Sequence, residues 1–320
     1  MSTDQGGANR GWKDYWQADR LQSCVPVDAT TEREIAEGWV SQFAALPDRS
    51  RILDIGTGNG VLLAHAATCA MHSGKKFELT GIDLADIDPA KYVDDHPAVR
   101  HDAQFLGRVD AATLPFADAS FDAVVSQFGL EYADIDRALD EVGRVLAHNG
   151  RMVWLAHSED SVVVAQNRDQ ETQVGLLLAD AGPLAAMGDF VDAIAGRRQL
   201  DRVTGQLRSA LQRAETYCRD HPPADIVRSV CTVIAETARD AYQYRPEDLQ
   251  HMLQDSARKL DAHSHRINDM NAAVLSGRRK RQVLDRLNSA PWSNAVSGAW
   301  RVGRDDSPIG VLFEAVIGSE

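Results

Sequence analysis

A glycine-rich turn and two later carboxylates are the residues of this chain whose types and spacing could do chemistry. The segment 51–60 reads RILDIGTGNG and places glycines at positions 56, 58 and 60. Glycine is needed where the backbone turns with a positive φ angle, or where a ligand must approach the main chain without a Cβ in the way. Asp83 and Asp110, which we expect at the ends of two later strands, could accept hydrogen bonds from such a ligand.

Two common nucleotide-binding turns do not fit this spacing. A P-loop needs GxxxxGK followed by Ser or Thr, and this turn contains no lysine. A dinucleotide-binding turn needs GxGxxG, whereas Gly60 comes one residue early for the third glycine of that pattern. The spacing excludes a P-loop and weakens the interpretation as an NAD site.

The elements that must position these residues alternate between strands and helices. We expect five strands, at 51–55, 75–84, 104–109, 121–127 and 151–158. We expect a helix at 30–46 that is capped by Thr30 or Thr31, and a second helix from residue 61 onward. A short helix should start around Asp86 to Pro89, and a helix at 134–147 should be closed by Asn149 and Gly150. This alternation predicts a parallel sheet with right-handed crossovers, which binds ligands at its carboxyl edge.

The second half of the chain has a different pattern. Residues 161–290 contain no convincing strand and repeat Leu, Ala, Arg and Gln at helical spacing. The segment from Pro246 keeps an approximately seven-residue apolar step, which predicts one long helix or two abutting ones. Two strand-like runs within 299–318 surround a turn at 305–308 and predict a hairpin at the end of the sheet. The helical insertion would then lie between strands five and six.

Composition and charge limit the classes of partner. The formal net charge is −13, which disfavours a nucleic acid or an anionic membrane as the standing partner. Four cysteines, Cys24, Cys69, Cys218 and Cys231, lie far apart without a CxxC pair and are expected to be reduced. No stretch approaches eighteen uncharged apolar residues, and the first residues lack a signal-peptide core. We therefore expect a soluble cytoplasmic protein whose partners are small molecules or proteins.

The motifs in order resemble those of the class I S-adenosylmethionine-dependent methyltransferases. The resemblance rests on Asp54-x-Gly56-x-Gly58-x-Gly60, on Asp83, and on the segments VDAATLPF and SFDAVVSQFGLEY. It covers about residues 50–157 and the terminal hairpin. The segment LPFADASFD resembles that of the subgroup named for ubiquinone and menaquinone methyltransferases, whose members methylate many different acceptors. The fold implied is a doubly wound, mostly parallel, seven-stranded Rossmann-like sheet.

The resemblance implies S-adenosyl-L-methionine (SAM) as cofactor and S-adenosyl-L-homocysteine (SAH) as product. The turn at Gly56, Thr57 and Gly58 would lie against the methionine portion, and Asp54 would fix the turn and reach the amino group, unless it only stabilises the turn. Asp83 would accept from both ribose hydroxyls. The adenine would contact Leu84, Asp110 and Ala111, and the floor would consist of Gln127 and Phe128. Without the glycine turn, such carboxylates would be ordinary strand ends or helix caps.

Methyl transfer from a sulfonium needs mainly positioning and exclusion of water, so a catalytic base is optional. The candidate bases are Glu131, Tyr132 and His157, near the ends of strands four and five. We select His157, because a neutral imidazole could take a proton near neutral pH. The alternative is a polar strand end without a catalytic role.

Two other patterns have ordinary explanations. His263 and His265 would point about 200° apart on one helix, so they cannot share a metal ion, and no metal site is expected. The basic run 278–281 is interpreted as a solvated face rather than a phosphate site.

The aromatic residues Trp12, Tyr15 and Trp16 either pin a surface helix or cover the ligand, and we include Tyr15 and Trp16 among the cofactor-binding residues. We divide the chain into an N-terminal segment (1–47), a methyltransferase core (48–160 and 291–320) and a helical insertion (161–290). The insertion is expected to cap the site or to form a homodimer.

The sequence thus predicts a SAM-dependent methyltransferase that acts on a small organic acceptor at O, N or C. The alternative is a SAM-binding regulatory or assembly protein without turnover. No membrane partner is expected, and a nucleic-acid substrate is disfavoured by charge.

Overall fold

The fold is described from a computed structural model, which describes residues 12, 15, 16, 29–93 and 102–318. The chain divides into two compact units. Unit 1 comprises Met1–Ala165 with Asp269–Glu320, and unit 2 comprises Gln166–Asn268. The predicted insertion, 161–290, is wider than unit 2, because residues 161–165 and 269–290 belong to unit 1.

Unit 1 is built on a seven-stranded sheet with the order β3-β2-β1-β4-β5-β7-β6. The strands are β1 (Arg51–Ile55), β2 (Glu78–Asp83), β3 (Ala103–Gly107), β4 (Phe121–Gln127), β5 (Leu146–Ala156), β6 (Trp292–Val302) and β7 (Ser307–Ile317). Strands β1 to β5 pair in parallel, whereas β7 runs antiparallel between β5 and β6. The predicted fold class, a mostly parallel seven-stranded sheet, is therefore confirmed.

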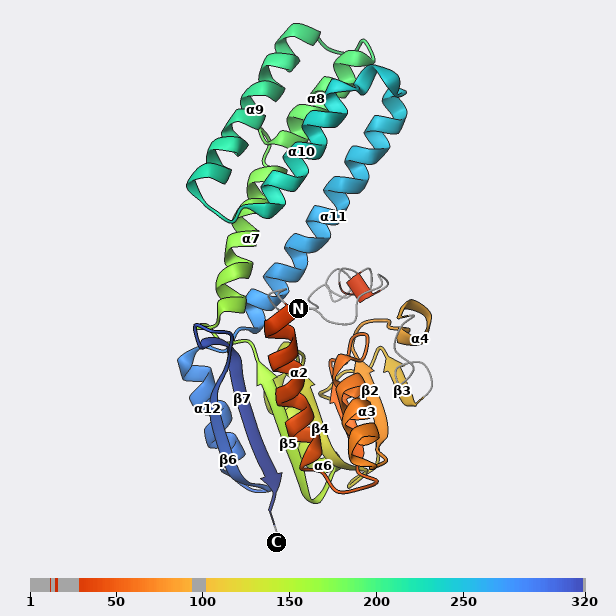
Figure 1. Ribbon diagram of the computed structural model, residues 1–320, viewed down its shortest axis with the longest axis vertical. Helices are drawn as coiled ribbons and strands as arrows, with labels where there is room; N and C mark the ends of the chain where they lie inside the picture. Colours follow the sequence, from red (N-terminus) through yellow and green to blue (C-terminus); the bar gives the residue numbers. More distant parts are fainter. Residues whose placement is uncertain (1–11, 13–14, 17–28, 94–101, 319–320) are drawn as a thin grey trace. The chain divides into compact units, whose positions relative to one another are not determined.

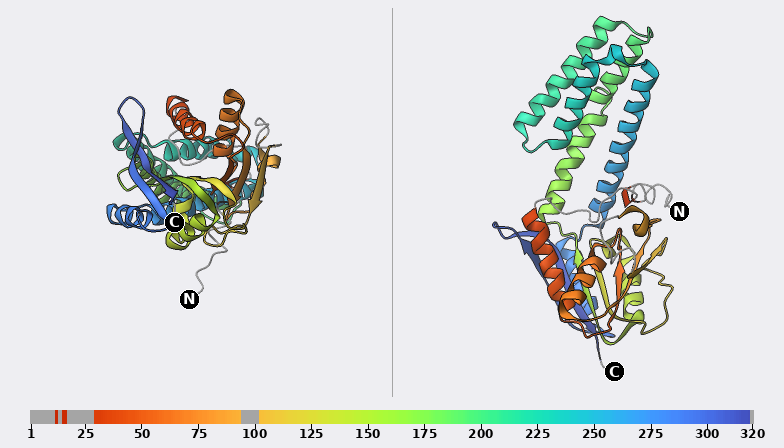
Figure 2. Two further views of the ribbon diagram at one scale, coloured as in Figure 1. Left: turned by 90° about the horizontal axis from the view of Figure 1, so that it is seen from below. Right: turned by 45° about the vertical axis from the view of Figure 1, so that its right-hand side comes forward.

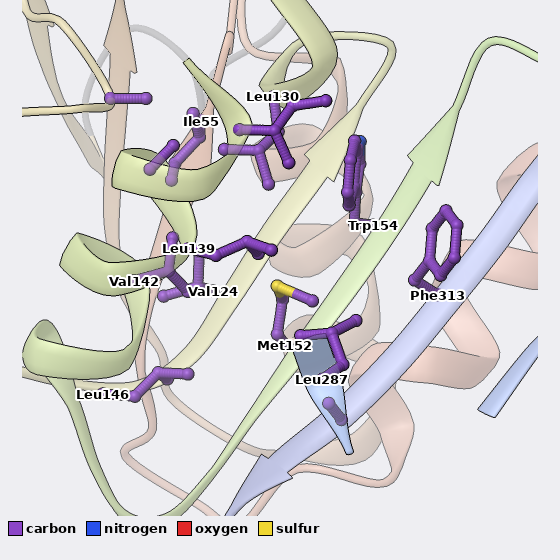
Figure 3. Close-up of a cluster of buried hydrophobic side chains, with 14 of the residues drawn as sticks. Ile55, Val124, Leu130, Leu139, Val142, Leu146, Met152, Trp154, Leu287 and Phe313 are labelled. Atoms are coloured by element: carbon purple, nitrogen blue, oxygen red, sulfur yellow. The ribbon is translucent and has the colours of Figure 1, made fainter. Parts of the chain in front are cut away.

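Helices cover both faces of this sheet, as Figure 1 and the left view of Figure 2 show. On one face lie α2 (Ala29–Ala44) and α3 (Val61–Ser73), whose side chains share a core with β1, β4 and β5. On the other lie α6 (Ile135–Val145) and α12 (Gly277–Leu287). Figure 3 shows Leu139 and Val142 of α6 beside Val124, with Leu287 near Met152. The central strands are apolar along their length because both faces are buried.

Several predicted boundaries are wrong. Thr30 and Thr31 lie inside α2, so neither caps it. Helix α6 ends at Val145, and β5 begins directly at Leu146. Asn149 and Gly150 consequently lie within β5, where the pairing with β4 shifts register, rather than closing the helix. Strand β3 ends at Gly107, before the predicted limit.

The terminal hairpin is longer than predicted. β6 begins at Trp292 rather than at residue 299, and the turn occupies 303–306. Most of β6 is exposed at the sheet edge, so its first residues lack the apolar pattern that identifies a strand. The short helix α4 (Pro89–Tyr92) starts at the predicted signal, with Asp88 as its N-cap residue.

Unit 2 consists of helices around a core of its own. The helices are α7 (Val162–Leu178, which starts in unit 1), α8 (Pro183–Ile194), α9 (Leu200–Asp220), α10 (Asp225–Arg239) and α11 (Pro246–Ala273, which ends in unit 1). Met187, Val191, Ala214 and Val227 are fully buried in this core. The predicted long segment from Pro246 is two helices, because the chain leaves α11 and pairs Leu275 with Ser158 before α12 begins.

One segment, Val162–Ile194, is long and apolar enough by length and composition to cross a membrane. It consists of two helices, α7 and α8, separated by a turn at 179–182. Of its most apolar window, 44% is buried, and Leu177, Met187 and Val191 pack in the core of unit 2. Core helices of soluble proteins have the same properties, so this segment is weak evidence for a membrane span.

Candidate functional site

The glycine turn connects β1 to α3 through three residues with positive φ angles. Gly56, Gly58 and Gly60 have φ of 71°, 51° and 87°. A Cβ on Gly56 would lie 2.6 Å from the Cα of Gly129, which follows β4. The backbone N–H groups of Gly56 and Thr57 both donate to the carbonyl of Ile82, each at 2.9 Å. The turn is thus packed between β2 and β4, where a side chain would not fit.

Asp83 joins the end of β2 to this turn. One carboxylate oxygen accepts from the backbone N–H of Gly58 at 2.9 Å, and the other accepts from that of Ala85 at 2.8 Å. Burial raises the pKa of Asp83, while the two backbone hydrogen bonds act in the opposite direction. The side chain is partly exposed, and each carboxylate oxygen can accept a further hydrogen bond.

Asp54 lies beneath the turn and does not line the pocket described below. It is 1% exposed and accepts a hydrogen bond of 2.7 Å from the hydroxyl of Thr57. Its pKa is raised to about 8, mainly by burial and also by the nearby charge of Asp83, against the lowering effect of the hydrogen bond from Thr57. Asp54 therefore stabilises the turn, and a contact with the cofactor stays a prediction.

A pocket of about 700 Å³ opens at the carboxyl edge of β1, β2 and β4, entirely within unit 1. Nine of the twelve residues predicted to bind the cofactor line it: Trp16, Gly56, Thr57, Asp83, Leu84, Asp110, Ala111, Gln127 and Phe128. The other three, Tyr15, Asp54 and Gly58, support residues that do. Leu84 is 55% exposed and places an apolar surface at the pocket wall.

The part of the pocket wall that follows β3 and β4 consists of backbone held by hydrogen bonds and of aromatic side chains. Asp110 is exposed and accepts from the backbone N–H of Ala112 at 2.8 Å. Phe128 has a φ of 55°, and its backbone N–H donates to the carbonyl of Leu155 at 2.8 Å. The side-chain oxygen of Gln127 accepts from the indole N–H of Trp39 at 2.5 Å. These interactions fix the floor of the pocket from beneath.

The predicted base, His157, does not line the pocket, whereas Glu131 and Tyr132 do. The imidazole of His157 is fully buried, and its Nδ1 lies 2.7 Å from Oε1 of Glu131. Glu131 also accepts from the backbone N–H of His157 at 2.8 Å and from the indole of Trp154 at 3.0 Å. The ring of Phe128 lies 4.4 Å from that of His157, centroid to centroid. A role for His157 as base stays a prediction.

An aromatic cluster from the N-terminal segment closes one side of the pocket. Trp12 contacts Tyr132 edge to face, with centroids 5.7 Å apart, and stacks on Trp16 at 6.4 Å. The carbonyl of Trp16 accepts from the side-chain amide of Asn59 at 3.1 Å. A Cβ on Gly58 would lie 2.4 Å from the ring of Trp16, so the glycine makes room for the indole. The residues 17–28 that follow lie outside the described part of the chain.

Several pocket residues were not identified from the sequence, among them Asp134, Arg137, Asp269, Ala272 and Ala273. Asp134 was recognised only as a helix start, and its side chain accepts from the backbone N–H of Arg137 at 3.3 Å. Asp269 accepts from the indole N–H of Trp12 at 3.2 Å. A pairing between residues 257 positions apart leaves no local signal in the sequence.

The remaining sequence features have structural partners. His263 lies 3.2 Å from Gln170 through Nε2, and His265 lies beside Asp261. Within the described ranges, no group of three or more His, Cys, Asp or Glu side chains could hold a metal ion. In the basic run, Arg279 pairs with Asp136 and Lys280 with Asp160. Cys69, Cys218 and Cys231 are free thiols, and Cys24 lies outside the described residues.

The sheet order, the glycine turn and the pocket at the carboxyl edge define a Rossmann-like, nucleoside-binding α/β domain. Residues 53–154 match the family model described as a methyltransferase domain. A demethylmenaquinone methyltransferase from Thermus thermophilus is 40% identical over 106 residues, which are 33% of this chain and 46% of that protein. A biotin biosynthesis bifunctional protein from Cellvibrio japonicus is 26% identical over 259 residues, 80% of this chain and 41% of that protein.

Among solved structures, a SAM-dependent methyltransferase from Mesorhizobium loti is 25% identical over 38% of this chain and 53% of that chain, with a TM-score of 0.30. The chain spans less than half the length of the two curated relatives. Its segment 53–154 is a methyltransferase domain of the class I, SAM-dependent kind. The resemblance in the sequence is thereby confirmed, and SAM is the cofactor of this class.

The residues present fit this cofactor. The pocket volume of about 700 Å³ is in the range of small-molecule sites, and its polar groups converge from separate strand ends. Asp83 and Asp110 offer carboxylate oxygens to hydroxyl and amino donors, and Leu84 and Ala111 offer apolar surface to a flat ring. The pocket therefore combines acceptors and apolar walls of the kinds that a nucleoside sulfonium requires.

Proposed function

We propose that this protein transfers a methyl group from SAM to a small organic acceptor at O, N or C. The observation that carries the proposal is a single pocket lined by the glycine turn, by Asp83 and Asp110, and by the aromatic residues Trp12 and Tyr132. In this proposal the glycine turn, Asp83 and Asp110 would bind the cofactor and form the cofactor end of the pocket, and Trp12 and Tyr132 would contact the acceptor and form its acceptor end. The match of residues 53–154 to a methyltransferase domain supports this assignment.

The cofactor end would bind SAM through the following residues of this chain. Gly56 and Thr57 would contact the methionine portion, and Asp54 would hold the turn through Thr57. Asp83 would accept from the ribose hydroxyls, and Asp110 from the adenine amino group, because each carboxylate then meets a donor. The apolar contacts to the adenine would come from Leu84 and Ala111, with Gln127 and Phe128 beneath, and with Tyr15 and Trp16 on the N-terminal side.

The mechanism that we propose depends on positioning. Bound SAM supplies a methyl group on a sulfonium, which is an activated leaving group. Trp12, Trp16 and Tyr132 exclude water from the pocket and restrict the orientation of the acceptor. His157 was the predicted base; its burial favours the alternative, in which it positions Glu131 and the floor residue Phe128.

A SAM-binding protein without turnover is the second candidate. The observation that favours it is Glu131, the most buried carboxylate of the pocket wall, which already accepts from Trp154 and His157. We also propose, from the sequence, a cytoplasmic location, the domain limits 1–47, 48–160 with 291–320, and 161–290, and a role of the insertion as a cap or homodimer surface.

Calorimetry with SAM tests the cofactor end. Asp83→Asn keeps one acceptor for the backbone but removes the charge, and we expect at least about tenfold weaker SAM binding. Asp86→Asn is the matched control, since Asp86 pairs with Arg108 and does not line the pocket. Equal affinity in the wild type and Asp83→Asn would contradict the site.

Formation of SAH in the presence of a metabolite extract tests turnover. The wild type should convert methyl-labelled SAM to SAH with label transferred to an extract component. Tight SAM binding without any transferred label would favour the protein without turnover.

A further inference from the structure

The pocket wall contains a cation that forms no ion pair with another described side chain. Arg137 lies in the first turns of α6, and it is the only Lys, Arg or His among the described residues that line the pocket. Its backbone N–H donates to Asp134 at 3.3 Å. The nearby Glu141 is occupied by Arg144, which forms hydrogen bonds of 2.8 Å to both carboxylate oxygens.

Other arginines of the same layer are paired. Arg279 of α12 binds Asp136 at 3.2 Å, and Arg286 of α12 binds Asp140. Arg144 of α6 binds both Glu141 and Asp118. Acidic residues outnumber basic ones in the chain, 47 to 34, so carboxylate partners are abundant. In this setting Arg137 is a guanidinium at a pocket wall that remains available to a ligand.

The carboxylates of the pocket already have donors from the protein. Glu131 accepts from Trp154 and His157, and Asp269 accepts from Trp12. Asp83 accepts from the backbone of the glycine turn. An anionic group of a second ligand would be repelled by these carboxylates and attracted to the guanidinium of Arg137.

The pocket that Arg137 lines also has aromatic and small apolar surfaces. Tyr132 and Trp12 contact each other edge to face, and Ala272 and Ala273 of α11 line the same pocket. Such surfaces take a flat or acyl body, whereas the planar guanidinium favours a carboxylate or phosphate. The exposed position of Arg137 places that anion toward solvent.

We propose that the acceptor is a small molecule with an aromatic or acyl body and an anionic group, and that Arg137 is the residue that selects this group. The inference rests on the proposed function, since it names the acceptor class of the same pocket. Arg137 binds the anion, and the aromatic residues Trp12 and Tyr132 bind the body. The acceptor atom then faces the cofactor end.

The first test compares benzoate, phenyl phosphate and benzamide as probes, by ligand-observed NMR titration with and without SAH. Benzoate or phenyl phosphate should bind about fivefold more tightly than neutral benzamide, and Arg137→Ala should remove the difference. Arg137→Lys should retain part of it. The preferred anion distinguishes a carboxylate from a phosphate acceptor.

Arg304→Ala is the matched control, because Arg304 is exposed in the β6–β7 turn and does not line the pocket. Equal affinities for charged and neutral probes in the wild type, or a preference that survives Arg137→Ala, would overturn the inference. Separate calorimetry shows whether SAH binds at all, so a failure of the cofactor site is distinguished from a failure of the acceptor assignment.

The second test uses methyl-labelled SAM with a metabolite extract and identifies labelled products by mass spectrometry. The products should derive from anionic acceptors, and Arg137→Ala should lower their yield about fivefold while Arg304→Ala does not. Products from neutral or cationic acceptors would contradict the proposal. If no product forms, the probe titration alone decides it.

Discussion

The two ends of the pocket are built in different ways. The cofactor end consists of strand ends and a turn held by backbone hydrogen bonds, as when Gly58 donates to Asp83. The proposed acceptor end consists of side chains from three distant segments, represented by Trp12, Arg137 and Asp269. A site made from backbone tolerates few changes, whereas a site made from side chains can be altered one residue at a time. The difference suggests that the first end fixes the cofactor and the second determines the acceptor.

The largest effect should come from a side chain placed in the turn itself. In Gly56→Val, the Cβ would meet the Cα of Gly129 at 2.6 Å while φ stays at 71°. We expect a loss of about 3 kcal/mol or more in the free energy of unfolding, and no measurable SAM binding. Chemical denaturation and calorimetry measure both quantities.

Gly74→Ala is the control for the backbone angle alone. Gly74 has a φ of 67°, but a Cβ there would meet nothing within 4 Å. It should cost only about 1–2 kcal/mol and leave SAM affinity unchanged. If Gly56→Val behaves in the same way, close packing does not define the cofactor end.

The buried pair of Glu131 and His157 lies against the floor residue Phe128 and should have the next largest effect. His157→Ala removes a fully buried ring and its contact with Glu131, which should cost about 3 kcal/mol of stability. His157→Gln can still donate to Glu131. We expect His157→Gln to keep most of the rate of SAH formation, because the ring does not line the pocket.

A catalytic role of His157 would give a different result. Turnover in His157→Gln would then fall about a hundredfold or more, with unchanged stability and SAM affinity. The pH dependence of the rate would also change between the wild type and this variant. That outcome would make the pair part of the acceptor end rather than its support.

Acidity should affect the cofactor end through Asp54. Its pKa is raised from 3.8 to about 8 by burial, so the native protein holds a proton that the unfolded chain releases. The resulting stability is complete below about pH 4 and is lost as the pH rises through about 8. Between pH 5 and pH 8 the free energy of unfolding should fall by about 4 kcal/mol.

Asp54→Asn should flatten this slope in thermal or chemical denaturation. Asp122→Asn provides the opposite case, since Arg51 lowers the pKa of Asp122. Its contribution is present above the ordinary pKa of an aspartate and is lost only in acid. Asp122→Asn should therefore leave the slope of stability between pH 5 and pH 8 unchanged. A steep slope that persists in Asp54→Asn would disprove the assignment of this slope to Asp54.

The smallest effect should come from the anchor of the aromatic cluster. Asp269→Ala removes the acceptor of the Trp12 indole, at a cost of about 1 kcal/mol, and should raise the mobility of that ring in fluorescence anisotropy. Asp269→Asn keeps an acceptor oxygen and should resemble the wild type. SAM affinity should be unaffected in both variants; a loss of SAM binding would show that the two ends are not separate.

Much of the cofactor end could be predicted because its residues follow strands directly. RILDI and FDAVVSQ have the apolar character of buried strands, so the residues that end them must meet at one edge. The predicted boundaries of helices and strands are wrong where a local sequence pattern conflicts with tertiary packing. Asn149 and Gly150 are typical of a helix end, yet β5 begins at Leu146 because its first residue pairs with Phe121.

The sequence by itself determined the strands on either side of the turn, the turn glycines and the carboxylates Asp83 and Asp110, because these depend on local patterns. Tertiary structure alone decided which side chains complete the pocket. Trp12 reaches Asp269 only because α11 ends beside the N-terminal segment, and His157 is covered only because Phe128 and Tyr132 pack against it. Such contacts depend on how distant segments pack, and no local pattern encodes them.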